Sequence, residues 1–306
     1  MWSRWTKAIR DWAYQGRPAE GSAPRIGLAL GGGFSRALAH VGVLQVFEEN
    51  HIPIHCIAGI SSGAIIASTY ASGTPLEEII SVGVCTTFNS YARWTLSRLG
   101  LATSERMDPW LRKALRRTCF EEMQTPLAVV ATDLLTGAPV TFKDRGDMIA
   151  PVRATCAYPG LFLPVEIGGR WLVDGGISVS APVDAVREMG ATHVIAVYLH
   201  TVNISGIRPS NLLQVVGQCF SILQDRMMTD WREAAQLVIE PNVAEFAWND
   251  FDRAKDLVRA GRDAALDALP IIQKWFQQGT VSQAAPAAAS PLVPLISAAS
   301  PRIRHP

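Results

Sequence analysis

The sequence predicts an α/β protein with a mostly parallel central sheet. Short segments that are apolar throughout have the composition of strands buried on both faces; they are 25–30 (RIGLAL), 127–134 (LAVVATDL) and 193–199 (HVIAVYL). Segments with helical spacing of apolar residues lie between such strands. This alternation of strands and helices favours a layered α/β domain.

The first half of this alternation begins with the strand at 25–30. Three glycines follow it, and then a helix is expected from about Arg36 to Asn50. Its apolar residues recur every three positions: Leu38, Val41, Leu44 and Phe47. A second short strand, 54–59 (IHCIAG), leads into a helix at 61–73 that is apolar enough to require burial.

In the second half, 171–177 (WLVDGGI) is expected to be a strand fragment that ends in a turn. The segment 180–190 (SAPVDAVREMG) is expected to be a helix closed by Gly190, a good C-terminal cap. A long amphipathic helix is expected over 250–269.

Three regions follow from the composition. Residues 1–24 form an amphipathic extension and a linker, residues 25–278 form the main domain, and residues 279–306 form a tail rich in Ala, Pro and Ser. The tail cannot build a core and is expected to be disordered. No internal repeat is visible.

Charge and cysteine content narrow the classes of function. A net charge of +1 gives no field that favours nucleic acid, so no nucleic-acid partner is expected. The five cysteines include no CxxC pair and lie mostly in apolar segments, which is typical of buried free thiols in a reducing compartment. No run of 18 apolar residues is present, so no spanning helix is expected, and the predicted location is the cytoplasm.

The N-terminal segment 1–17 has the pattern of an amphipathic helix. Four apolar residues at helical spacing share one face, with basic residues beside them: Trp2, Trp5, Ile9 and Trp12, with Arg4, Lys7 and Arg10. One interpretation is a helix that lies on a membrane surface. The other is a helix that packs on its own domain, and the pattern alone does not choose between them.

The three glycines, Gly31 to Gly33, stand where a helix begins. Such a loop serves either a nucleotide phosphate or a negatively charged reaction intermediate. A dinucleotide fingerprint requires glycine at the sixth position, where this chain has Arg36. A P-loop requires a lysine, and none follows these glycines. Both nucleotide interpretations are therefore weak.

A second motif favours the reaction intermediate. Residues 59–63 read G-I-S-S-G, with Ser61 between a strand and an apolar helix, which is the context of a nucleophile elbow. The structural alternative is a glycine-rich turn that packs a helix on a strand. With Ser61 as nucleophile, the N–H groups of Gly31 to Gly33 are placed to hold a tetrahedral oxyanion. Arg36, one turn into the helix, could add positive charge near the same spot or near a lipid phosphate.

A serine nucleophile needs a base, and two kinds of candidate are present. His200 closes a strand at the carboxyl end, where sites of open sheets lie, whereas His193 precedes that strand. Asp174, followed by two glycines, is suited to projecting a carboxylate into a site, although an Asp-Gly turn has the same sequence. Thr132 and Asp133 either support this site or start a turn. His40 is predicted to be a packing histidine.

The segments GGGFSRALAHVGVL (31–44), GISSG (59–63) and DGG (174–176), in this order, resemble the patatin-like phospholipase family, in particular its bacterial branch. Weaker similarities at 131–137, 153–165 and 250–261 extend the resemblance over about 25–269. The resemblance implies a three-layer α/β/α domain related to the catalytic core of cytosolic phospholipase A2. It also implies a Ser–Asp dyad without a catalytic histidine.

Carried over onto this chain, the resemblance assigns Ser61 as the nucleophile and Asp174 as its base. It assigns the oxyanion hole to backbone N–H groups of the glycine loop, chiefly Gly32 and Gly33 with Gly31 or Phe34, and substrate binding to Arg36. The family usually has glycine after this arginine, where this chain has Ala37. A positive φ there would strain alanine, whereas a helical φ would not.

The expected function is that of a serine acyl hydrolase in lipid degradation, which cleaves ester bonds of phospholipids or other lipids through an acyl-enzyme. No metal or cofactor is expected, and the expected partner is a lipid or ester substrate. A membrane surface joins it only under the first interpretation of residues 1–17, in which they form an interfacial helix. The alternatives are a small-molecule carboxylesterase or thioesterase, and a lipid-binding regulator without catalysis on the same fold. A pure binder has no need of Ser61 and Asp174 together with the glycine loop.

Overall fold

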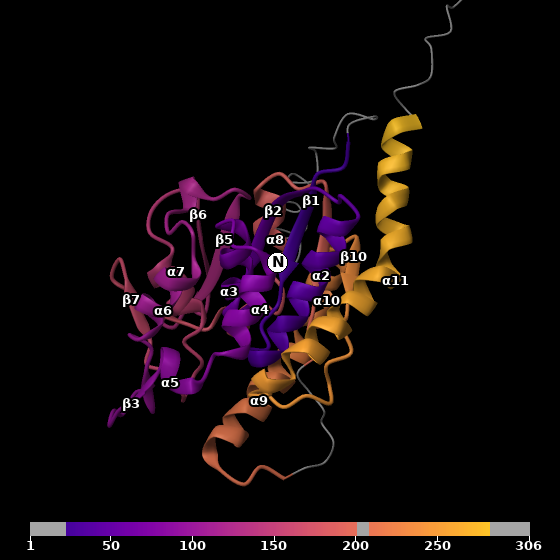
Figure 1. Cartoon of the computed structure of the whole chain (residues 1–306). Helices are drawn as coiled ribbons and strands as arrows, with labels where there is room; N and C mark the ends of the chain where they lie inside the picture. Colours follow the sequence, from indigo (N-terminus) through magenta and orange to yellow (C-terminus); the bar gives the residue numbers. More distant parts are fainter. Residues whose placement is uncertain (1–22, 201–207, 282–306) are drawn as a thin grey trace, which may run out of the picture.

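The computed structural model describes residues 23–200 and 208–281 (Figure 1). An eight-stranded sheet has the order β10–β9–β1–β2–β5–β8–β7, and β6 also pairs with β5. Its strands are β1 Ile26–Leu30, β2 Ile54–Gly59, β5 Leu127–Asp133, β6 Pro139–Lys143, β7 Val165–Ile167, β8 Arg170–Val173, β9 His193–Val197 and β10 Leu237–Ile239. A separate two-stranded hairpin joins β3 Arg93–Trp94 to β4 Ala102–Thr103.

The sheet is parallel through its centre. Strands β10, β9, β1, β2 and β5 pair in parallel, whereas β6 and β8 run antiparallel to β5 and β7 runs antiparallel to β8. The predicted α/β class with a mostly parallel sheet is therefore confirmed. Because the parallel strands end at the same edge, the loops after β1 and β2 meet there.

The α-helices are α2 Leu38–Glu49, α3 Ser61–Ala71, α4 Leu76–Val84, α5 Phe88–Tyr91, α6 Met107–Ala114, α7 Ile149–Thr155, α8 Val183–Glu188, α9 Leu212–Arg226, α10 Met228–Ala234 and α11 Ala254–Val281. Short 3-10 turns are η1 Phe34–Ala37, η2 Phe120–Glu122, η3 Gly175–Ile177 and η4 Phe251–Arg253. Figure 1 shows α2, α3 and α4 in front of the sheet and α8 behind it.

Two cores on opposite faces of the sheet make the predicted three layers. Leu28 of β1 and Ile57 of β2 point into the core beneath α2, α3 and α11. The intervening residues Ala29 and Ala58 point to the other face, into the core beneath α8 and α10. The strand period of two therefore divides one apolar sequence between two buried faces.

Several predicted elements differ from the observed ones at their ends. The helix expected over 36–50 begins as the 3-10 turn η1, and α2 then runs to Glu49. Gly190 caps α8 as expected, with a φ of 91° and its N–H donated to the carbonyl of Arg187. Helix α11 continues to Val281, three residues into the predicted tail. The predicted N-terminal helix, 1–17, and the tail beyond 281 lie outside the described residues.

The expectation of buried thiols was wrong for part of the set. Cys56 and Cys156 are buried, but Cys85 and Cys219 are exposed and Cys119 is intermediate. An apolar neighbourhood in sequence does not decide exposure, because Cys85 follows the end of α4 and Cys219 lies on the outer face of α9. All five are free. Among the helices of the described ranges, none has both the length and the apolar composition to cross a bilayer.

Helices α2 and α11 pack without a side chain between them at one crossing. A Cβ on Gly261 would lie 1.8 Å from the carbonyl oxygen of Ala39, and a Cβ on Gly42 would lie 2.0 Å from the carbonyl oxygen of Val258. These distances are far shorter than any van der Waals contact. The long helix α11 is therefore held against the layer that carries α2 by backbone contact.

We expect Gly261→Ala to lower the free energy of unfolding by about 1–3 kcal/mol, because the new methyl group forces the two helices apart. The matched control is Gly217→Ala in α9, where the new Cβ would meet only the Tyr158 hydroxyl at 3.4 Å. That control is expected to be neutral, or stabilising by up to about 1 kcal/mol. Urea unfolding measures both, and equal stabilities of the two variants would contradict the close crossing.

Candidate active site

Ser61 stands at the junction of β2 and α3. Strand β2 ends at Gly59, Ile60 is extended, and Ser61 opens α3 with a φ of 49°. A non-glycine residue in this left-handed region carries strain on the order of 1–3 kcal/mol and is held by its surroundings. The strand–turn–helix context that the sequence predicted for this serine is therefore present, with the side chain at the N-terminus of a helix, where negative charge is favoured.

Two glycines make this tight turn possible. A Cβ on Gly59 would lie 2.4 Å from the Cα of Ala64, and a Cβ on Gly63 would lie 2.3 Å from the carbonyl oxygen of Gly31. The first glycine lets the chain reverse, and the second lets α3 pack directly on the loop that follows β1. The spacing G-x-S-x-G thus brings the serine against the three glycines.

Thr155, at the end of α7, holds the backbone of Ser61. Its hydroxyl accepts the Ser61 N–H at 2.9 Å and donates to the carbonyl of Val130 in β5. The residue is fully buried. Sequence analysis missed this role, and the only available signal was that Thr155 lies in the segment 153–165, which resembles the family.

Asp174 follows β8 and lies in the buried interior, with 1% of its surface exposed. Its Oδ1 accepts the N–H of Gly176 at 2.9 Å, whereas its Oδ2 is buried and has no hydrogen-bond partner among the described residues. Burial raises the pKa of this carboxyl to about 7; the Gly176 N–H and the Ser61 hydroxyl oppose the rise. A carboxyl poised near neutrality is suited to exchanging protons.

For Thr132 and Asp133 the sequence left two roles open, support of the site and the start of a turn, and each residue has one of them. The Thr132 hydroxyl donates to the carbonyl of Asp174 at 2.9 Å and so supports that residue. The Asp133 carboxylate accepts the N–H groups of Leu135 and Thr136, which is the pattern of a residue that starts a turn.

Along the glycine loop, N–H groups that have a hydrogen-bond acceptor alternate with N–H groups that have none. The Gly31 N–H donates to Val197 in β9, and the Gly33 N–H donates to the Ser62 hydroxyl at 3.0 Å. Within the described ranges, the N–H groups of Gly32 and Phe34 donate to no other group. Gly32 lies directly against Ser61, since a Cβ there would be 3.0 Å from the serine Cβ and 3.5 Å from its Oγ.

The remainder of the loop is anchored from two sides. His40 in α2 is fully buried, and its Nε2 is 2.8 Å from the carbonyl oxygen of Gly31. Burial lowers the pKa of His40 to about 4, so the ring is neutral and its Nε2–H donates. This agrees with the predicted packing role. The φ of Ala37 is −59°, so the alanine in place of the family glycine is unstrained.

Arg36 is half-buried and ties the glycine loop to the segment before α11. Its Nε donates to the carbonyl of Phe246 at 2.9 Å. Burial lowers the pKa of Arg36, and the nearby charge of Asp250 opposes this effect. Arg36 also lines the wide cavity described next.

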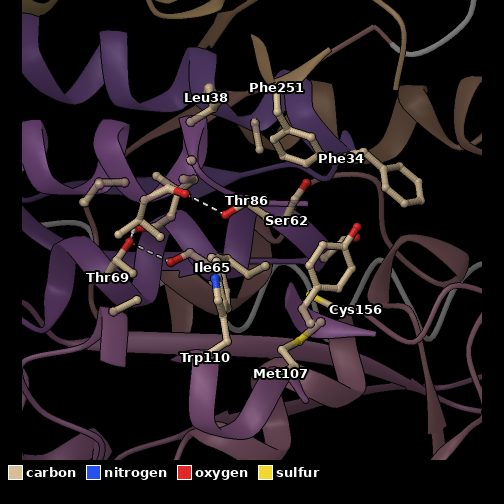
Figure 2. Close-up of a pocket in the computed structure, with 18 of the residues that line it drawn as sticks. Phe34, Leu38, Ser62, Ile65, Thr69, Thr86, Met107, Trp110, Cys156 and Phe251 are labelled. Atoms are coloured by element: carbon tan, nitrogen blue, oxygen red, sulfur yellow. Dashed lines mark hydrogen bonds between the residues drawn. The ribbon is translucent and has the colours of Figure 1, made fainter. Parts of the chain in front are cut away.

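Two cavities meet at Ser61. The inner one, about 100 Å³, is almost wholly apolar and runs beneath α3, α4 and α6. Figure 2 shows Leu38, Ile65, Met107, Trp110 and Phe251 around it. The outer one, about 650 Å³, is lined by polar residues as well, among them Asp174, Arg36 and Gln224.

Three residues belong to both cavities: Ser61, Phe34 and Tyr158. The rings of Phe34 and Tyr158 meet edge to face, with centroids 5.2 Å apart, and Phe34 has a φ of 53°. This aromatic pair therefore stands beside the serine at the boundary between the apolar inner space and the open outer one.

Neither histidine candidate is bonded to Ser61 or Asp174. The Nε2 of His200 is 2.7 Å from Glu240 Oε1 on the neighbouring strand end. His193 lies at the amino end of β9, next to Thr192 and the ring of Trp275. The structure thus brings together Ser61, Asp174 and the glycine loop and leaves both histidines in other contacts.

The family model for patatin-like phospholipases matches residues 28–187, just over half of the chain. The chain therefore belongs to the patatin-like phospholipase family.

Two sequence relatives and one solved structure are similar to parts of this chain. An uncharacterized NTE family protein of Mycobacterium bovis is 36% identical over 182 residues, which are 58% of this chain and 50% of that protein. The lysophospholipase NTE1 of Cryptococcus neoformans is 31% identical over 187 residues, 58% of this chain and 11% of that protein. The chain spans half or less of the length of these relatives. The crystal structure of VipD from Legionella pneumophila superposes with a TM-score of 0.49 at 12% identity, over 82% of this chain and 67% of VipD.

We expect Thr155→Val to lower the free energy of unfolding by about 1–3 kcal/mol, because it leaves the Ser61 N–H and the Val130 carbonyl buried without a partner. Thr155→Ser keeps the hydroxyl and is the matched control. Denaturant unfolding should show a small loss for Ser and a larger one for Val. A loss for Val no larger than the loss for Ser would contradict the proposed bracing of Ser61 by the Thr155 hydroxyl.

Proposed function

We propose that this protein is a serine acyl hydrolase that cleaves ester bonds of phospholipids or other lipids, with Ser61 as nucleophile and Asp174 as its base. The observation that carries the proposal is the buried Asp174 carboxyl, which has a free Oδ2, a pKa near neutrality and a place in the same cavity wall as Ser61. The family membership and the lysophospholipase among the relatives support a lipid substrate.

In the proposed first step, the Asp174 carboxylate accepts the proton of the Ser61 hydroxyl while Oγ attacks the ester carbonyl carbon. The carbonyl oxygen becomes an oxyanion. The N–H groups of Gly32 and Phe34 are the donors that we assign to it, because those of Gly31 and Gly33 already have partners. Asp174 then returns the proton to the leaving alkoxide as the C–O bond breaks, which leaves the acyl group on Ser61.

In the proposed second step, water replaces the alcohol. Asp174 accepts a proton from water as the water oxygen attacks the acyl carbon, and the proton passes back to Ser61 Oγ when the acid departs. The apolar inner cavity suits the acyl chain, and the outer cavity with Arg36 suits the alcohol portion or a phosphate. Contact of residues 1–17 with a membrane surface remains part of the proposal.

We expect Ser61→Ala and Asp174→Asn each to abolish hydrolysis of a soluble ester, because the first removes the nucleophile and the second removes the base while keeping its shape. His200→Ala and His193→Ala are the matched controls and should retain more than about a tenth of wild-type kcat. Circular dichroism of all four variants checks that each is folded.

A folded but inactive His200→Ala would contradict the dyad and favour a catalytic triad that includes His200, since members of a triad act as a unit. Full activity of Ser61→Ala would remove catalysis from this site, whereas a folded wild-type protein that hydrolyses no ester would favour a lipid-binding regulator. A panel of phospholipids, small carboxylic esters and thioesters separates the lipid hydrolase from an esterase or a thioesterase.

The pH profile tests the base directly. Because the base must be ionised, kcat/KM for a soluble ester should fall about tenfold per pH unit below an apparent pKa near 7. The same limb should persist in His200→Ala, which excludes that imidazole as its source. A flat profile between pH 5 and 8 would contradict the raised pKa of Asp174.

A further inference from the structure

The mouth of the outer cavity is bordered by two segments that carry unusually exposed apolar side chains. On the β3–β4 hairpin they are Trp94, Leu96, Leu99 and Leu101, with exposed fractions of 59%, 105%, 55% and 40%. On α9 they are Leu212, Val215, Ile222 and Leu223. Both segments also supply the lining, through Trp94 from the hairpin and Leu213 from α9. We call the eight exposed apolar residues the mouth rim; they are Trp94, Leu96, Leu99, Leu101, Leu212, Val215, Ile222 and Leu223.

Helix α9 carries apolar residues both toward the outer cavity and toward solvent. Its residues Leu213, Gly217 and Phe220 face the outer cavity. Its outward face carries a stripe of apolar residues at helical spacing: Leu212, Val215, Cys219 and Ile222, all exposed. In Figure 1, α9 and β3 lie at the same end of the molecule. A helix that leaves an apolar stripe in water points to a partner surface.

Charge indicates what kind of surface this is. The segments 88–104 and 208–224 contain no Asp or Glu, and their charged residues are Arg93, Arg98 and Arg208. Helix α9 then closes with one residue of each charge, Asp225 and Arg226. None of these three arginines makes an ion pair within the described part of the chain. Exposed apolar side chains that share their segments with three unpaired arginines match a bilayer of anionic phospholipid, in which acyl chains lie beneath negative headgroups.

We propose that the mouth rim docks this protein on an anionic phospholipid surface, with Leu96 and Leu212 inserted and Arg93 and Arg98 at the headgroups. A second copy of the chain fits less well, because it would seal the mouth that leads to Ser61 and would bring two sets of unpaired arginines together. Docking in this orientation opens the outer cavity toward the lipid. The proposed function supplies only the reason for docking, which is access to lipid; the docking itself does not depend on hydrolysis.

The test is sedimentation with vesicles of phosphatidylcholine, alone or mixed with phosphatidylglycerol, with Ser61→Ala in every protein so that lipid is not consumed. We expect the double change Leu96→Glu/Leu212→Glu to reduce binding to mixed vesicles at least tenfold. The matched control, Leu266→Glu/Ile271→Glu, alters two leucine-sized residues on α11 that are each 45% exposed, and it should bind like the parent.

The charge arm uses Arg93→Gln/Arg98→Gln, which should weaken binding to mixed vesicles and leave binding to neutral ones unchanged. Its control is Arg145→Gln/Arg259→Gln, which removes two arginines outside the mouth rim and should bind both kinds of vesicle like the parent. With Ser61 restored, the rim variants should hydrolyse a soluble ester at the wild-type rate and vesicle lipid more slowly. An inactive wild type would defeat the proposed function but leave the binding result valid.

Unchanged vesicle binding by Leu96→Glu/Leu212→Glu overturns the proposal, and so does a parent protein that does not bind vesicles. Analytical ultracentrifugation distinguishes the remaining case. A parent dimer that the rim variants dissociate, without vesicle binding, would make this face a protein interface instead.

Discussion

The site depends on the contact between the start of α3 and the loop that follows β1. Gly63 leaves no room for a side chain, since a Cβ would lie 2.3 Å from the Gly31 carbonyl oxygen, and this lets the two segments touch through their backbones. The contact places Gly32 against Ser61 and positions the Ser62 hydroxyl to accept the Gly33 N–H. A larger residue at this point would separate the serine from the glycine loop.

The surrounding layers hold this contact in place through buried hydrogen bonds. Thr155 reaches from α7 to the strained backbone of Ser61, and His40 reaches from α2 to the Gly31 carbonyl. Neither side chain faces a substrate; each satisfies a backbone group that the tight turn leaves open. Strain at Ser61 is thus balanced by partners from separate elements, as expected where a fold over-determines a functional geometry.

Asp174 differs from Thr155 and His40, because its burial leaves one polar atom without a hydrogen bond. Its backbone is held by Thr132 and by the Ala157 carbonyl, and one carboxyl oxygen is satisfied by Gly176. The other oxygen is left without a partner in a poorly solvated place, which raises the pKa of the carboxyl toward neutrality. Burying an incompletely bonded acid costs free energy, and carboxyl groups with such raised pKa values cluster at functional sites, which supports the role that we propose for Asp174. The mouth rim carries a comparable cost on the surface, because its apolar side chains are exposed to water.

The sequence by itself determined the α/β class, the buried strands β1, β2, β5 and β9 and the turn at Ser61, because these follow from local periodicity and from glycines that only a tight turn requires. It did not show β6, β7, β10 or α9, whose segments carry no comparable local pattern. Tertiary structure alone decided which N–H groups of the loop already have partners, that Thr155 braces Ser61, and that α9 turns its apolar stripe outward. Those outcomes depend on residues far apart in the chain: Val197 meets Gly31 only because β9 pairs with β1. No local pattern records such a pairing, so the free donors and the exposed stripe emerge only when the layers assemble.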